Sequence, residues 1–188
     1  MNKVAVITPT IGRPELKQTI QSVKNQTMPV THYVIVDGKQ FLDAADSILH
    51  KEKDVIKIEM PFNGGVKKFF GHPFYAAFPF LINEPYICFL DDDNWFEPEH
   101  IETMFKFLQK NNLDWCFSLR NLVTRDGSFL CEDDCLSLGY HPRFDNQICV
   151  DTNCFLLKTE VARNAGHAWY TTNGDQMFTQ ELLKNKTI

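Results

Sequence analysis

Short apolar runs alternate with segments of helical periodicity through the first 110 residues. The apolar runs lie at about 3–8, 33–36, 55–59 and 86–90, and apolar residues recur at helical spacing over about 14–26, 42–50 and 98–110. Continuously apolar strands are typical of a parallel sheet buried on both faces, and strand–helix–strand units build such a sheet with right-handed connections. The alternation therefore predicts an α/β fold with a mostly parallel central sheet flanked by helices.

The later part of the chain is less regular. An aromatic-rich stretch at 66–82 is predicted to be helical, with interruptions at Pro73 and Pro79. We then expect a strand at 115–119, a hairpin over 122–130 that turns at Asp126-Gly127, and a loop at 131–146. After this loop we expect a strand at 148–157, a helix at 159–165 capped by Thr159, a loop at 167–173 and a helix at 175–183. These elements add a small antiparallel part to one domain of 188 residues.

Composition excludes several classes of function. The net charge of −5 argues against a general nucleic-acid binder, and no stretch approaches the roughly 20 apolar residues of a membrane span. The six cysteines form no CxxC pair, so we expect reduced structural thiols. The chain opens on a strand pattern and not on a signal peptide, which favours a cytoplasmic protein.

Three consecutive carboxylates, Asp91-Asp92-Asp93, follow the apolar run 86–90. Adjacent carboxylates repel one another, and a divalent cation would offset that repulsion while leaving positions open for phosphate oxygens. The alternative is a solvated loop whose Asp residues lie near a helix N-terminus. Because the carboxyl ends of parallel strands share one edge, Thr8-Pro9-Thr10 and Asp37-Gly38 are predicted to lie beside the triplet. Three polar strand ends at one edge favour a binding site.

The first turn of the predicted sheet lacks the known phosphate-binding loops. Thr10-Ile11-Gly12-Arg13-Pro14 contains neither GxGxxG nor GxxxxGK[ST]. Phosphate binding is therefore expected to depend on a metal ion at the fourth strand.

Three segments in this order resemble family 2 glycosyltransferases of the GT-A fold. They are Val4-Ala5-Val6-Ile7-Thr8-Pro9-Thr10 with Arg13-Pro14, then Val34-Ile35-Val36-Asp37-Gly38, then Tyr86-Ile87-Cys88-Phe89-Leu90-Asp91-Asp92-Asp93-Asn94 with Pro98. The last segment is similar to the DxD motif of that family. The resemblance runs from residue 3 to about residue 112, which would make 1–112 the nucleotide-sugar half and 113–188 the acceptor and catalytic half.

The resemblance implies a nucleoside-diphosphate sugar donor, with UDP-sugars favoured, bound through Mg²⁺ or Mn²⁺. Asp37 would accept a hydrogen bond from the base, Asp93 would bind the metal, and Asp91 would contact the metal or the ribose. Asp92 is the member of the triplet whose side chain is expected to matter least. The residues assigned to the nucleotide sugar are Thr8, Pro9, Thr10, Arg13, Asp37, Lys67, Asp91 and Asp92.

An inverting transfer needs a general base, which the family places at the start of a late helix. Asp175 occupies the matching position here, although a plain helix N-cap is the alternative role. Asp151 is a weaker alternative for the base. His167 would supply a third metal ligand, as a C-terminal His does in some GT-A enzymes; an exposed loop histidine is the simpler interpretation.

The chain also departs from the family pattern. No Arg follows Asn63-Gly64-Gly65, so Lys67 or Lys68 would have to supply positive charge to the diphosphate, unless both are solvated. The usual second Asp after the second strand is missing. The acceptor is unknown and could be a saccharide, a lipid-linked molecule or a protein. Trp95 follows the triplet closely enough to shape the acceptor side of the site. An oligomer is compatible with the sequence. A nucleotidyltransferase and a catalytically inactive sugar- or nucleotide-binding module are the alternatives.

Overall fold

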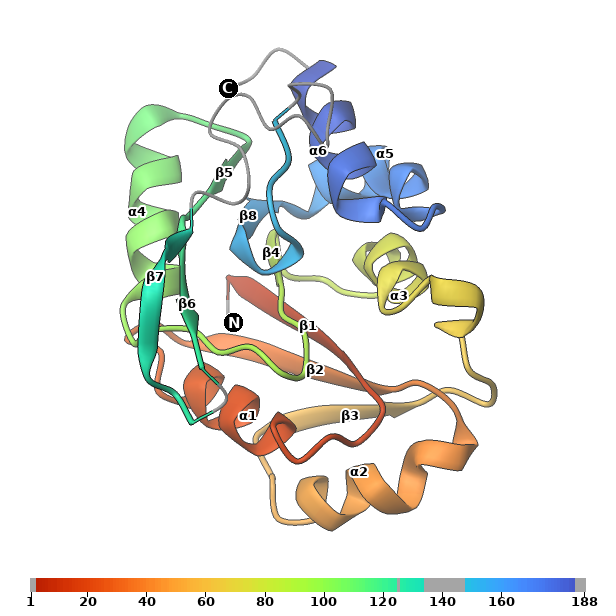
Figure 1. Ribbon diagram of the computed structural model, residues 1–188. Coiled ribbons are helices and arrows are strands. Elements are labelled where there is room, and N and C mark those ends of the chain that lie inside the picture. Colours follow the sequence, from red (N-terminus) through yellow and green to blue (C-terminus); the bar gives the residue numbers. More distant parts are fainter. Residues whose placement is uncertain (1–2, 125, 134–147, 185–188) are drawn as a thin grey trace.

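The computed structural model describes residues 3–124, 126–133 and 148–184. Its main sheet has six strands in the order β3-β2-β1-β4-β8-β5 (Figure 1). The strands are β1 (Val4–Thr10), β2 (Val30–Val36), β3 (Val55–Glu59), β4 (Tyr86–Phe89), β5 (Trp115–Phe117) and β8 (Phe155–Lys158). The first four are mutually parallel, whereas β8 runs antiparallel to both β4 and β5. The fold is thus the predicted α/β architecture with a mostly parallel sheet.

Helices cover both faces of this sheet. They are α1 (Leu16–Lys24), α2 (Leu42–Leu49), α3 (His72–Ala77), α4 (His100–Asn111), α5 (Thr159–Ala165) and α6 (Gly174–Lys184), with 3₁₀ segments η1 (Lys39–Phe41), η2 (Val66–Lys68), η3 (Phe78–Phe80), η5 (Thr152–Cys154) and η6 (Gly166–Trp169). Helices α1, α2 and α4 pack on one face and α3, α5 and α6 on the other. No helix of the described residues combines the length and apolar character that a bilayer crossing needs.

Strand β1 lies at the centre of the sheet, and every one of its residues is buried. Its side chains alternate between the two faces, as strand geometry requires. Ala5 and Ile7 join the core under α3, α5 and α6, and Val4 and Val6 join the core under α1 and α4. This burial on both faces explains why the run reads as continuously apolar.

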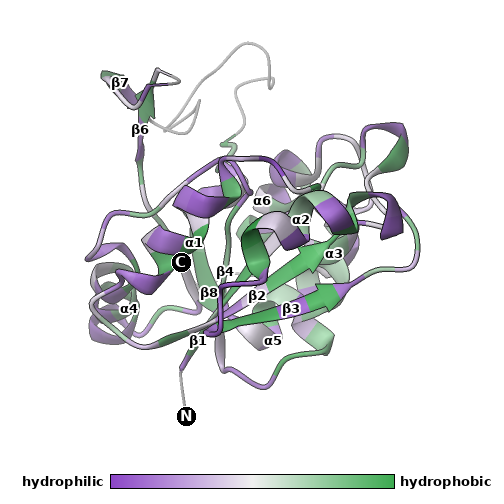
Figure 2. Ribbon diagram, turned by 90° about the horizontal axis from the view of Figure 1, so that it is seen from below, coloured by the Kyte–Doolittle hydropathy of each residue, from purple (hydrophilic) through white to green (hydrophobic). Residues whose placement is uncertain are grey.

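A second, two-stranded sheet is formed by the hairpin of β6 (Arg120–Val123) and β7 (Phe129–Asp133). The hairpin stands out from the main body of the molecule in Figure 2. It confirms the predicted antiparallel element, although β7 continues through 131–133, where a loop was expected. The remainder of that expected loop, 134–146, lies outside the described residues.

Four other sequence expectations need correction. The helix predicted from 66 begins only at His72, because Lys67, Lys68 and Phe70 all adopt positive φ. The strand predicted at 148–157 begins at Phe155, after η5. Thr159 lies inside α5 and does not cap it, since its hydroxyl donates to the Glu84 carbonyl. The predicted 167–173 loop likewise starts with the 3₁₀ segment η6.

Two of the predicted thiols behave as expected. Cys88 and Cys116 are free and buried among apolar side chains. Burial raises the pKa of both thiols, so they stay protonated and unreactive at neutral pH. Cys135 lies outside the described residues.

Candidate active site

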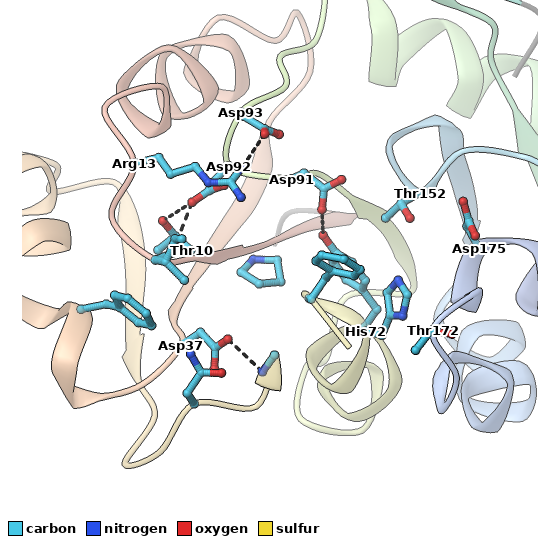
Figure 3. Close-up of a pocket in the computed structure, with 18 of the residues that line it drawn as sticks. Thr10, Arg13, Asp37, His72, Asp91, Asp92, Asp93, Thr152, Thr172 and Asp175 are labelled. Atoms are coloured by element: carbon cyan, nitrogen blue, oxygen red, sulfur yellow. Dashed lines mark hydrogen bonds and ion pairs between the residues drawn. The ribbon is translucent and has the colours of Figure 1, made fainter. Parts of the chain in front are cut away.

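A cavity of about 550 Å³ lies beyond the carboxyl ends of β1, β2 and β4 (Figure 3). Thr10, Asp37 and Asp91 reach it from these three strand ends, and Asp175 reaches it from the first turn of α6. Open α/β sheets bind ligands at this edge, and the volume is that of a small-molecule site. The cavity therefore joins the two halves of the chain at one place.

Asp92 ties the first turn to the end of β4. It is only 5% exposed, and its carboxylate accepts hydrogen bonds from the Thr10 hydroxyl (2.6 Å) and the Ile11 N–H (3.3 Å). Its other oxygen lies 3.5 Å from the Arg13 guanidinium. Asp92 lines the cavity, but these partners occupy its carboxylate, so its main effect is to fix the shape of the turn.

Gly12 makes this turn possible. Its φ of 78° lies in the left-handed region, and a Cβ there would stand 2.6 Å from the backbone nitrogen of Ala45 in α2. Only glycine fits both constraints without a shift of the neighbouring helix.

Asp93 lines the cavity and forms an ion pair with Arg13 (Figure 3). Both side chains are more than 40% exposed. Solvent screening makes such a pair weak, so an incoming ligand can rearrange it at little cost. Arg13 and Asp93 thus line the cavity with partly exposed charges.

Asp91 is held from two sides. The Tyr75 hydroxyl donates to one carboxylate oxygen, and the Asn153 side-chain amide donates to the other at 3.0 Å. The same Asn153 accepts the backbone N–H of Asp91 at 2.6 Å. Burial raises the pKa of Asp91 to about 6; the hydrogen bonds oppose this rise, and repulsion from Asp151 and Asp93 adds to it.

Asn153 also connects Asp91 to the hairpin. Asp151 accepts the backbone and side-chain N–H groups of Asn153 at 3.0 and 2.9 Å. Its other oxygen forms an ion pair with Arg120, whose Nε donates to Asp133 at 2.6 Å. A continuous chain of polar contacts therefore runs from β6–β7 to the end of β4. Arg120 thus occupies one oxygen of Asp151, whereas Asp175 has no ion-pair partner among the described residues.

Asp175 lies in the first turn of α6 and not at its N-cap, so the capping interpretation is wrong. Its carboxylate accepts the Gln176 N–H at 2.8 Å and faces the cavity beside His72 (Figure 3). Burial raises the pKa of Asp175; repulsion from Asp151 adds to this, whereas the Gln176 N–H and His72 act in the opposite direction. Gly174 lets the helix begin here, because a Cβ would stand 2.7 Å from the His72 ring.

Asp37 closes the lower side of the cavity as drawn in Figure 3. Its two oxygens accept the backbone N–H groups of Gly64 and Gly65, the second at 3.0 Å. Burial raises its pKa and these two hydrogen bonds lower it. Asp37 thereby fixes the turn after β3, and each oxygen keeps a lone pair for a ligand.

The lining of the cavity is strongly acidic. Its charged side chains among the described residues are one guanidinium, Arg13, and six carboxylates: Asp37, Asp91, Asp92, Asp93, Asp151 and Asp175. Carboxylates crowded in this way favour a bound cation. The described residues contain no cluster of three ligating side chains able to hold a metal alone. A divalent ion held by Asp91 and Asp93 would therefore need phosphate and water oxygens as its other ligands.

Three predicted site residues do not line this cavity. Thr8 is fully buried within the sheet and lies 2.9 Å from the His32 ring. Lys67 is exposed on η2, and the exposed His167 lies 3.7 Å from the Glu181 carboxylate on α6. The structure thus corrects the assignment of Thr8 and Lys67 to the nucleotide sugar and of His167 to the metal.

Three residues that do shape the site were missed: His72, Tyr75 and Asn153. His72 and Tyr75 lie in an aromatic-rich helix, where the sequence pattern indicates only packing. The polar run Asp151-Thr152-Asn153 interrupts an otherwise apolar stretch, and this interruption is the signal that would have pointed to Asn153.

Comparison with known proteins agrees with this geometry. The sequence model of Glycosyl transferase family 2 matches residues 5–129, about two thirds of the chain. The chain is 28% identical over 128 residues to poly(ribitol-phosphate) β-N-acetylglucosaminyltransferase TarP of Staphylococcus aureus (strain N315). That match covers 61% of this chain and 35% of TarP.

Solved structures of S. aureus TarS share the fold. The match to TarS covers 96% of this chain and 33% of TarS, with a TM-score of 0.66 and 16% identity. TarS 1–349 in complex with UDP gives a TM-score of 0.65 at 11% identity, and in complex with UDP-GlcNAc 0.66 at 14%. Each of these two covers 96% of this chain, and the chain spans 55% and 53% of them. The chain thus spans about a third to a half of the length of these relatives.

Proposed function

The chain belongs to glycosyl transferase family 2, and on that premise we propose that it transfers a sugar from a UDP-sugar to a hydroxyl group of an acceptor. The observation that carries the proposal is the convergence at one cavity of three parallel strand ends and the first turn of α6. The strand ends bring Asp37, Asp91 and Asp93, and the helix brings Asp175.

The donor half of the proposal rests on the strand ends. The uracil lies toward Asp37, the ribose and diphosphate lie along Thr10 and Arg13, and the sugar lies toward Asp91. UDP is favoured as the nucleotide of the donor because structures of TarS, which shares the fold, have been solved with UDP and with UDP-GlcNAc. Arg13 supplies the positive charge at the diphosphate for which the sequence offered Lys67 or Lys68.

We further propose that Asp91 and Asp93 hold Mn²⁺ or Mg²⁺ together with the diphosphate. Such an ion stabilises the negative charge that develops on the departing UDP. Tyr75 and Asn153 fix the Asp91 carboxylate in place, and hydrogen-bonded partners of this kind set the orientation of ligating carboxylates. The acidic lining supports this assignment, because a cation offsets the repulsion among its carboxylates.

The reaction is proposed to invert the anomeric carbon, with Asp175 as general base. The acceptor oxygen forms a bond to the anomeric carbon as the bond to the β-phosphate oxygen of UDP breaks. The acceptor proton passes to the Asp175 carboxylate, and both electrons of the broken bond leave with UDP. A raised pKa makes Asp175 a stronger base than an ordinary aspartate, which suits it to this role.

Titration calorimetry tests the donor site. We expect UDP to bind with a Kd that falls at least ten-fold when Mn²⁺ is added, and GDP to bind more weakly. Asp91→Asn is expected to remove the Mn²⁺ dependence, whereas Asp54→Asn, at an exposed position far from the cavity, keeps it. If no nucleoside diphosphate binds in a metal-dependent way, the proposal is wrong.

Product analysis separates the alternatives. A glycosyltransferase slowly hydrolyses its UDP-sugar and releases UDP and free sugar. A nucleotidyltransferase instead joins a nucleoside triphosphate to a sugar phosphate and releases pyrophosphate. An inactive module binds UDP and releases neither product.

A further inference from the structure

A second cavity, of about 760 Å³, adjoins the first on the far side of Asp93. Its walls are the start of α1, the loop between β4 and α4, and the β6–β7 hairpin that stands out from the body in Figure 2. Asp93 lines both cavities, and Asn153 of the second is next but one to Asp151 of the first. A molecule in the second cavity can therefore present one end to the first.

Aromatic and uncharged polar side chains face this cavity together. Trp95, on the loop after β4, is half-buried, and Phe129, on β7, is 61% exposed. Gln18, Asn121 and Thr124 also line the cavity and carry amide and hydroxyl groups. Flat apolar rings beside hydrogen-bonding groups suit a sugar, which has apolar ring faces and hydroxyl edges.

The charge of the walls is the more specific feature. Glu15, Glu97 and Glu132 line the cavity and have no ion-pair partner among the described residues. Arg120 is the one guanidinium in the described lining, and Asp133 and Asp151 already neutralise it. Phosphate recognition uses Arg or Lys side chains able to turn to the ligand, whereas the carboxylates in the described part of these walls would repel a phosphate.

We propose that this second cavity is the acceptor cleft and that it takes a neutral saccharide and disfavours an anionic, phosphate-linked polymer. The proposal rests on the proposed transfer reaction and adds the class of acceptor. It separates this chain from TarP, whose name specifies a poly(ribitol-phosphate) acceptor. The acceptor ring stacks on Trp95 and Phe129, and its reacting hydroxyl passes Asp93 toward the donor sugar.

The test measures acceptor binding and transfer in the presence of UDP-sugar and Mn²⁺. The full chain is screened against an array of neutral oligosaccharides and against a ribitol-phosphate oligomer. We expect transfer to at least one neutral saccharide with a kcat/KM at least ten-fold above that for the oligomer. Added salt should raise the rate with the oligomer, because it screens the repulsion.

Matched variants locate the cleft. Trp95→Ala and Phe129→Ala should each raise the KM for the neutral acceptor about ten-fold, whereas Phe107→Ala, an equally exposed aromatic on α4 outside both cavities, should not. Glu97→Lys with Glu132→Lys should improve use of the ribitol-phosphate oligomer at least five-fold. Glu99→Lys, exposed but outside the cavity, is the control for added charge.

Two outcomes overturn the inference while leaving the proposed function intact. In both, UDP binding and donor hydrolysis are normal. In the first, the ribitol-phosphate oligomer is the better acceptor; in the second, no neutral saccharide of the array is bound or used. If UDP itself does not bind, the proposed function fails first, and calorimetry reveals this independently of any acceptor.

Discussion

The two halves of this chain bring residues to the cavity in different ways. In the parallel half, Asp37 and Asp91 arrive because neighbouring strands end at the same edge of the sheet. In the antiparallel half, Asn153 is placed by side-chain contacts with Asp91 and Asp151, and Asp175 by the start of α6 against His72. Backbone topology thus builds the proposed donor side, and side-chain contacts attach the proposed catalytic side to it.

The largest expected effect concerns the catalytic side. Asp175→Asn removes the proposed base without changing the size of the side chain, and kcat for transfer should fall about 10³-fold, within the usual range for a general base. The Kd for UDP, measured by calorimetry, should change less than two-fold, because the donor side is intact. Asp54→Asn, at an exposed position outside both cavities, is the control. A variant as fast as the wild type would show that Asp175 is not the base.

The contact between the halves is tested at Asn153. Asn153→Asp replaces the amide donor by a second carboxylate, so the orientation of Asp91 is lost and repulsion is added. We expect kcat/KM to fall roughly 10–100-fold, the usual cost of losing such a partner of a metal ligand. The Mn²⁺ concentration for half-maximal rate should rise as well, which a general loss of stability would not cause. Asn111→Asp, exposed on α4, should change neither quantity; an unchanged Mn²⁺ requirement in N153D would disprove the positioning role.

The parallel half carries a pH-dependent contribution to stability at His32. This side chain is buried beside Thr8, and burial lowers its pKa to about 3. Between pH 6.5 and 3 the unfolded chain takes up a proton at His32 that the folded chain does not. The stabilisation linked to His32 is therefore complete above pH 6.5. As the pH falls below that value, the free energy of unfolding decreases by up to about 1.4 kcal/mol per pH unit.

Urea unfolding at several pH values, with wild type and His32→Gln, isolates this contribution. The glutamine amide can keep the hydrogen bond to Thr8 but does not titrate. We expect the free energy of unfolding of the wild type to fall more steeply than that of the variant below pH 6.5. If the free energies of unfolding of wild type and variant fall with the same slope, His32 titrates alike in the folded and unfolded states and the proposed contribution is absent.

The smallest expected effect is a change in UDP affinity, and it distinguishes Arg13 from Lys67. Arg13→Ala should weaken UDP binding about five-fold, because a partly exposed charge contributes about 1 kcal/mol. Lys67→Ala should change the affinity less than two-fold, since Lys67 is exposed and lies outside the cavity. Calorimetry under identical salt conditions measures both. The reverse order of effects would restore the sequence-based assignment of Lys67.

The sequence predicted that polar strand ends meet at one edge of the sheet, and the cavity there confirms this, because the determinants are local. Apolar strands end at polar groups, and parallel topology gathers Thr10, Asp37 and Asp91 without reference to any side-chain contact. Thr8 does not reach the cavity because it lies two residues before the end of β1. It shares a face with Thr10, but there the sheet is covered and its hydroxyl contacts the buried His32 ring.

The catalytic side was predicted less completely because long-range contacts determine it. Asp175 was found from its place at a helix start, but the bonds of Asn153 and Tyr75 to Asp91 join residues 62 and 16 positions apart. The spacing of apolar residues along the sequence does not indicate such contacts. His167 was misplaced for the same reason, since only the packing of η6 beside α6 shows that it faces Glu181.

A crystal structure of the full chain with UDP and Mn²⁺ tests the central claim most directly, because anomalous scattering locates the metal without assumption. We predict one Mn²⁺ peak between the carboxylates of Asp91 and Asp93 and the two phosphates, with the uracil beside Asp37. UDP bound elsewhere, for example in the second cavity, or a Mn²⁺ peak away from both carboxylates, would contradict the account.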